Sequence, residues 1–161
     1  MRASTFMGAV VIFVLILSAV TSSMIVAGSL SVDMAGNLGR TAETQHSATR
    51  SEFPNVKNVN VRFSAGSSNV ELKFVDNSDL LYKAVFNYRP NVEQPIVTQT
   101  LRDGVLTVSI YQFSGSAAII LGSDCNYNIQ ITMDSGGFTV NLDENAHVET
   151  LSVGVNSGGG T

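Results

Sequence analysis

The sequence has 161 residues, of which 44% are apolar and 14% are charged, and its formal net charge is −4. These values fit one folded domain with accessory segments, and they exclude a disordered chain and a basic nucleic-acid-binding protein. The single cysteine, Cys125, excludes an intramolecular disulfide and a cysteine-built zinc cage, and we expect it to be a small, buried or half-buried apolar residue.

Residues 1–32 are expected to form a transmembrane signal-anchor helix. No charged residue occurs between Arg2 and Asp33, and about twenty apolar residues suffice to cross the hydrocarbon core of a bilayer as a helix. A cation at the amino terminus favours a cytoplasmic start. We therefore expect a single-pass cell-membrane protein with an extracytoplasmic C-terminal domain. The anchoring side chains would include Phe6, Val11, Phe13, Leu15 and Leu17.

Two other interpretations of this segment stay open. Small residues follow the apolar stretch at Thr21-Ser22-Ser23 and at Val26-Ala27-Gly28, as in a cleaved signal peptide, which would give a secreted protein. Arg2-Ala3 before a long apolar helix also resembles the processing site of archaeal pilin-like proteins. That resemblance implies a pilin-like or archaellum-associated filament subunit with an N-terminal helix and a β head.

Residues 33–55 are predicted to be a linker between the anchor and the domain. The stretch has few large apolar residues and no sustained periodicity, which is typical of a tether. His46 lies here, and we expect it to be solvated, because a metal site would need further ligands close by.

From residue 56 to residue 161, apolar and polar residues alternate, which predicts strands with one buried face. Turn residues separate the runs, and Asp103-Gly104 is the sharpest hairpin signal. The strands expected are Val56 to Phe63, Asn69 to Val75, Leu80 to Tyr88, Ile96 to Leu101, Val105 to Tyr111, Ala117 to Leu121, Tyr127 to Met133, Phe138 to Leu142 and His147 to Val155.

One unit recurs in this region: a strand, a glycine turn and a second strand. Apolar alternation runs into Gly136-Gly137, and the same pattern runs into Gly158-Gly159 after an offset of 22 residues. A third copy aligns Val59 with Ile129 and Gly66 with Gly136. Repeats of this size are typical of stacked β-solenoids, in which glycine permits the corner. The expected fold class is all-β, a single-stranded β-helix-like solenoid, with a β-sandwich as the alternative.

Residues 59–161, with "SAGSSNVEL", "LLYKAVFNYRP", "DGVLTVSI" and "YNIQITMDSGGFTVNLDENAHVETLSVGVNSGGGT", resemble the toastrack domains of bacteria and archaea. These are also classed as putative adhesins, or as the extracytoplasmic part of cell-wall-antibiotic-response membrane proteins. The resemblance implies a β-helix-like domain outside a membrane, with a role in envelope-stress sensing or surface interaction. It brings no catalytic residues. Family members usually continue with further rungs after the second glycine turn, so the resemblance leads us to expect either a truncated piece or a last rung that is capped by another subunit.

The residues give no support for catalysis, a metal or a cofactor. His147 has no nucleophile elbow beside it, and no helix or phosphate-loop lysine follows the Ser-Gly turns. We therefore expect a non-enzymatic domain without cofactors, which binds no nucleic acid. Its C-terminal run would leave an unpaired strand edge, and such an edge invites another strand. We expect self-association or a protein partner there, through Leu151, Val153 and Val155.

Overall fold

A computed structural model describes residues 41–89, 91, 93–142 and 144–161. These residues form an all-β domain with a single seven-stranded sheet. The all-β prediction is therefore confirmed. The strands are β1 (Ala42–Thr49), β2 (Asn58–Phe74), β3 (Leu80–Tyr88), β4 (Ile96–Arg102), β5 (Val105–Leu121), β6 (Asn126–Asn141) and β7 (Val148–Gly160).

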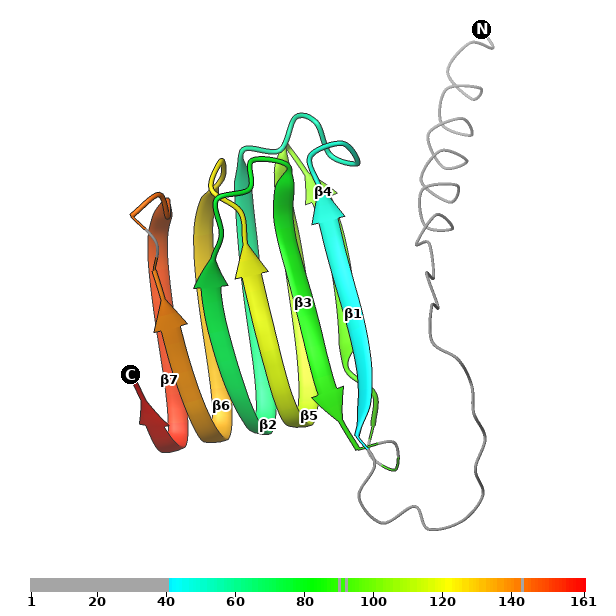
Figure 1. The fold of residues 1–161 in the computed structure, drawn as a ribbon, viewed down its shortest axis with the longest axis vertical. Coiled ribbons are helices and arrows are strands. Elements are labelled where there is room, and N and C mark those ends of the chain that lie inside the picture. Colours follow the sequence, from blue (N-terminus) through cyan, green and yellow to red (C-terminus); the bar gives the residue numbers. More distant parts are fainter. Residues whose placement is uncertain (1–40, 90, 92, 143) are drawn as a thin grey trace, which may run out of the picture. The chain divides into compact units, whose positions relative to one another are not determined.

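Four long strands form the body of the domain in the order β5-β2-β6-β7, and each neighbouring pair is parallel. Figure 1 shows that these strands turn back at the lower end of the view, so that their halves lie in two layers. The first layer contains the halves before the corner, and the second layer contains the halves after it. The strand, glycine turn and strand predicted as separate pieces are thus one continuous strand in β2, β5 and β6.

The core lies between the two layers. In β2 the buried residues include Val59, Val61 and Phe63 before the corner, and Val70 and Leu72 after it. The buried positions of β2 are odd-numbered before the corner and even-numbered after it. Both halves of the strand therefore direct their apolar side chains into the space between the layers. Because the strands are stacked in register, each apolar position continues as a row through the neighbouring strands; Phe63, for example, lies between Ile110 and Ile131.

The β5 end of the stack carries a separate antiparallel strand in each layer. In the first layer β4 pairs with β5 over residues 105–111, and in the second layer β3 pairs with β5 over residues 116–121. Arg102 is paired with Val105, so two residues form the turn, and both Asp103 and Gly104 have positive φ. The hairpin predicted at Asp103-Gly104 is confirmed, since a two-residue turn of this kind requires positive φ at both positions.

The linker predicted for residues 33–55 is wrong over Ala42–Thr49, because these residues form β1. The strand pairs antiparallel with β3, with His46 opposite Ala84. His46 is half-buried and meets Phe86 edge to face, with 6.2 Å between the ring centroids. Burial lowers the pKa of His46 below its usual 6.5. The expectation of a solvated histidine is therefore also wrong.

For the third copy of the repeat, the predicted inward and outward faces are confirmed, but the predicted register is wrong. Val59 pairs with Tyr127 and Val61 with Ile129, so the copy is displaced by two residues from the predicted alignment of Val59 with Ile129. A shift of two residues keeps every side chain on its own face, so periodicity alone does not distinguish the two registers. The 22-residue offset between β6 and β7 is confirmed, since Gly136 pairs with Gly158.

Arg50 connects three segments at the end of the stack away from the corners. Its guanidinium donates to the carbonyls of Ser78, Val56 and Asp124 at 2.9–3.2 Å, so its fork ties the segment after β1 to two distant turns. A planar guanidinium with five donors can serve several carbonyls at once, which an ammonium group does less well.

The Tyr127 side chain of β6 makes two buried hydrogen bonds to the backbone of neighbouring segments. Its hydroxyl donates to the Leu81 carbonyl at 2.8 Å and accepts from the Gly122 amide at 3.1 Å. Its ring packs edge to face on Phe74, with centroids 5.6 Å apart. Burial is the main reason why the pKa of Tyr127 lies well above its usual value, so the hydroxyl keeps its proton.

We expect Tyr127→Phe to lower the free energy of unfolding by about 2–3 kcal/mol, because a buried carbonyl and a buried amide both lose their partner. Urea unfolding of the full chain in mild detergent, followed by circular dichroism, measures this change. Tyr111→Phe is the matched control, since Tyr111 is 43% exposed. Equal unfolding midpoints for the two variants would contradict the assigned role of the Tyr127 hydroxyl.

Candidate functional site

The glycines predicted at the turns lie at the corners of the long strands. Gly136 and Gly158 have φ of 125° and 147°, a region that side chains with a Cβ rarely adopt. A Cβ on Gly136 would overlap the Ser68 carbonyl, and one on Gly158 would overlap the Gly136 carbonyl. The corners of successive strands therefore stack with their backbones in contact. Gly137 and Gly159 directly follow these positions, and Gly66 lies at the corner of β2 against the Phe113 carbonyl of β5. None of these three predicted glycines has a positive φ.

The residues predicted for an edge interaction lie on β7, the last strand of the stack. Leu151, Val153 and Val155 are in register with the core residues Ile129, Ile131 and Met133, so they face the space between the layers. Leu151 and Val153 are nevertheless 39% and 40% exposed, and Val155 is half-buried. Among the described strands, only β6 pairs with β7. Whether this edge binds another strand stays a prediction.

A second candidate surface, which the sequence did not reveal, is a shallow depression of about 280 Å³ on the outside of the first layer. It spans the outward faces of β2, β4 and β5. The side chains around it combine one guanidinium, three hydroxyls and two large apolar groups. They are Arg62, Ser64, Ile96, Thr98, Ser109 and Tyr111, and the buried residue Ile110 also contributes to the lining.

The strand pairing brings these residues together. Ile96 lies opposite Tyr111 in the antiparallel β4–β5 pair, and Tyr111 lies beside Ser64 in the parallel β5–β2 pair. One row along, Thr98, Ser109 and Arg62 follow each other in the same way. Directly opposite side chains on one face of a sheet are about 5 Å apart at Cβ, so each row forms a continuous contact surface.

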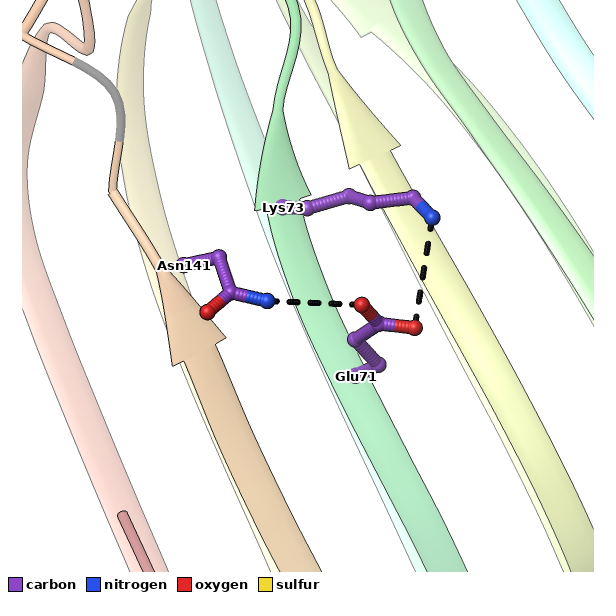
Figure 2. A network of polar contacts seen from close by, with 3 residues as sticks. All are labelled: Glu71, Lys73 and Asn141. Atoms are coloured by element: carbon purple, nitrogen blue, oxygen red, sulfur yellow. Dashed lines mark hydrogen bonds and ion pairs between the residues drawn. The ribbon is translucent and has the colours of Figure 1, made fainter.

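The outside of the second layer has a different character. Figure 2 shows Glu71 between two partners: Lys73, with 3.9 Å from Nζ to Oε2, and Asn141, whose Nδ2 donates to Oε1 at 3.3 Å. The charges of this face are therefore partly neutralised by each other. Exposed pairs of this kind contribute little to stability, typically below about 1 kcal/mol. On the first layer, by contrast, Arg62 has no ion pair within the described residues.

Cys125 is buried, with 2% of its surface exposed, as predicted for a small apolar residue. The Arg50 guanidinium donates to its Sγ at 3.3 Å. Burial raises the pKa of the Cys125 thiol, and the nearby positive charge of Arg50 only partly opposes this effect. Since the thiolate is the nucleophile, both access and ionisation disfavour reaction.

We therefore expect Cys125 in the folded protein to react with iodoacetamide at pH 7.5 at least tenfold more slowly than a free cysteine does, because the thiol is protonated and enclosed. Mass spectrometry of the intact protein against time measures the rate. The same protein in 8 M urea serves as the control and should react at the rate of the free amino acid. Equal rates in the two conditions would show that the site is open.

Other groups considered from the sequence do not form a reactive site. His147 is exposed, and its backbone carbonyl accepts a hydrogen bond from the Tyr127 amide. Across residues 41–161, apart from the three left undescribed, no three His, Cys, Asp or Glu side chains come close enough to hold a metal ion. The described part of the chain also holds no helix with the length and hydrophobicity of a membrane span. The predicted anchor residues, Phe6 to Leu17, lie outside the described residues.

Comparisons with known proteins show a fold and no family. No family model matches the sequence, and no curated protein matches it. Among solved structures, the chain is similar to one described as a "putative cell adhesion protein" from Clostridium sporogenes, with a TM-score of 0.65 and 16% sequence identity. The match covers 74% of this chain and 59% of that one, so this chain spans less than two thirds of its neighbour. The match shows a shared fold, and the resemblance to the toastrack family is not confirmed.

Proposed function

We propose that this chain is a non-catalytic binding protein, displayed outside a cell membrane, whose β domain is a solenoid built for surface binding. The observation that carries the proposal is the fold shared with a structure described as a "putative cell adhesion protein". The corner-bent, parallel strands support the solenoid assignment, because each strand buries its inner face against its neighbours. The resemblance to toastrack domains adds envelope-stress sensing as a specific form of this role.

The membrane location rests on the sequence of residues 1–32, where an apolar stretch follows Arg2. We propose a single-pass anchor with the β domain extracytoplasmic. Such an arrangement would hold the exposed outer faces of the domain where soluble or surface-bound partners can reach them.

The test of this proposal is the intact mass of the native protein, measured in membranes after a carbonate wash, combined with protease treatment of intact cells. We expect the full mass in the membrane pellet and digestion of the β domain from outside. Loss of the first twenty-odd residues would make the protein secreted, and loss of Met1 to Ala3 alone would favour the filament subunit. A β domain protected in intact cells and digested only after lysis would refute surface display.

We also propose that the β7 edge binds a protein strand, either from a second copy or from a partner. The edge offers a row of inward-facing apolar side chains that are exposed, Leu151 and Val153 among them. A strand added there would bury these side chains and pair with the free backbone groups of β7.

We expect Val153→Lys to abolish this association, because it places a charge inside the row that the added strand would cover. Light scattering after size exclusion, in detergent, measures the mass of the complex. Ser152→Lys is the matched control, since Ser152 lies on the outer face of the same strand and next to Val153. A strict monomer for the unmodified chain, with rapid hydrogen exchange along β7, would remove the self-association form of this proposal.

A further inference from the structure

The outward side chains of the first layer are mostly hydroxyls and amides, and the carboxylates near them, Asp134 and Glu149, accept hydrogen bonds from Asn156 and Asn128. The middle row of this face crosses five strands from β4 to β7 and consists of Thr98, Ser109, Arg62, Gln130 and Ser152. Neighbouring strands are about 4.8 Å apart, and outward side chains of one strand repeat at about 6.8 Å. The row therefore offers hydrogen-bond donors and acceptors at regular spacing, with a single positive charge at its centre.

The depression lies at the β4 side of this face, where large apolar side chains adjoin the hydroxyls. Tyr111 and Ile96 are directly paired and are 43% and 49% exposed. An exposed tyrosine has a flat apolar face and a polar tip. Such a face suits a ligand that is itself flat and apolar on one side and polar around its rim.

A pyranose ring has this form, because its axial C–H groups lie on one side and its hydroxyls surround the edge. The hydroxyls of Ser64 and Ser109 around the depression can each donate and accept a hydrogen bond. The Thr98 hydroxyl donates to the Ser109 carbonyl at 3.4 Å and can still accept one. The depression is open and shallow, so one ring would make few contacts. The polar rows that continue across β2, β6 and β7 would bind further rings of an extended chain.

The positive charge of Arg62 indicates that the ligand carries a negative charge. Arg62 lines the depression, and no carboxylate within the described residues forms an ion pair with its guanidinium. A planar guanidinium matches a carboxylate in a bidentate geometry. One cation on a chain of net charge −4 suits sparse carboxylates, and it does not suit a densely charged anion such as a polyphosphate.

We propose that the depression on β2, β4 and β5 binds an acidic polysaccharide, with a sugar carboxylate on Arg62 and a neighbouring ring on Tyr111. This inference rests on the proposed surface-binding function and gives that function a class of ligand. The inward-facing residues of the β7 edge, Leu151 and Val153, take no part in it.

The test uses the full chain in mild detergent and three uronate polysaccharides, namely polygalacturonate, alginate and hyaluronate, together with the methyl ester of each. Affinity electrophoresis and calorimetry measure binding. We expect at least one uronate to bind about tenfold more tightly than its neutral ester, because the ester lacks the charge-assisted bonds to Arg62. Raising the salt concentration should reduce this difference.

Two substitutions test the proposed contacts of Arg62 and Tyr111 separately. Arg62→Gln should weaken uronate binding about tenfold, to the level of the ester, and leave ester binding unchanged. Tyr111→Ala should weaken the uronate and the ester alike. The matched controls are Lys83→Gln, which removes a cation from the second layer, and Leu142→Ala, which removes an apolar side chain that is 59% exposed elsewhere. Both controls should bind as the unmodified chain does.

Three results would overturn the inference: no uronate bound in preference to its ester, binding that Arg62→Gln leaves unchanged, or equal losses with Lys83→Gln. Circular dichroism of each variant shows whether it is folded, so a loss caused by misfolding is recognised. Failure here is distinct from failure of the proposed function. A domain digested from outside intact cells that binds no uronate keeps its surface role and loses only this ligand.

Discussion

Replacing Gly136 with alanine should destabilise the domain by about 3–5 kcal/mol. Gly136 has a φ of 125°, and positive φ costs a residue with a Cβ about 1–3 kcal/mol. The new Cβ would also overlap the backbone carbonyl of Ser68 on the neighbouring strand. A backbone atom cannot turn aside as a side chain can, so the corners of β2 and β6 would have to separate, at a cost similar to that of overpacking.

Gly154→Ala is the matched control for this prediction. Gly154 lies on β7 in open space, with no atom within 4 Å of the position that a Cβ would occupy and no positive φ. Its substitution should change the free energy of unfolding by at most about 0.5 kcal/mol. Urea unfolding of both variants in mild detergent gives the comparison. If Gly136→Ala unfolds at the same urea concentration as Gly154→Ala, the corners do not stack through backbone contact.

Phe63→Ala should cost about 3–5 kcal/mol, the usual range for removing a phenylalanine ring from a core. Phe63 is 1% exposed and lies in a row between Ile110 of β5 and Ile131 of β6. The strands on both sides are held by their backbone pairing, so the cavity cannot close easily. The destabilisation should therefore be near the upper end of this range.

Phe113→Ala provides the comparison, because Phe113 belongs to β5 and is 53% exposed. We expect it to lower the unfolding free energy by less than about 1 kcal/mol, as for most exposed substitutions. Thermal unfolding by circular dichroism ranks the two variants with the unmodified chain. Similar losses for Phe63→Ala and Phe113→Ala would mean that the two-layer core is assigned wrongly.

The alternation of apolar and polar residues predicted most of the sheet, because each strand has one face in a shared core. It did not predict β1. The inward positions of that strand include Ala42, Thr44 and His46, which are small or polar, so the segment has no apolar signature. Its strand conformation depends on pairing with β3, and such tertiary support overrides local propensity.

The sequence also did not predict which strands lie next to each other in the sheet. The unit at β2 and the unit at β6 are 68 residues apart in the aligned pairs, and alternation tolerates any even shift between them. The candidate depression depends on this missing information. Arg62 and Tyr111 come from different strands, and each alone has the pattern of an ordinary outward residue. Only the lateral pairing of β2, β4 and β5 places them on one surface.

The order of the strands in the stack differs from their order in the chain, and this has a consequence for folding. β2 occupies the middle of the stack between β5 and β6, both of which follow it in the sequence. During synthesis, β2 would leave the ribosome with both edges unpaired until about fifty or more later residues had followed. Contacts between such distant segments close slowly, because the chain must first lose the entropy of a long loop. The nascent domain would thus pass through a stage in which its central strand is open to aggregation, and this stage would be the point at which a chaperone is most useful.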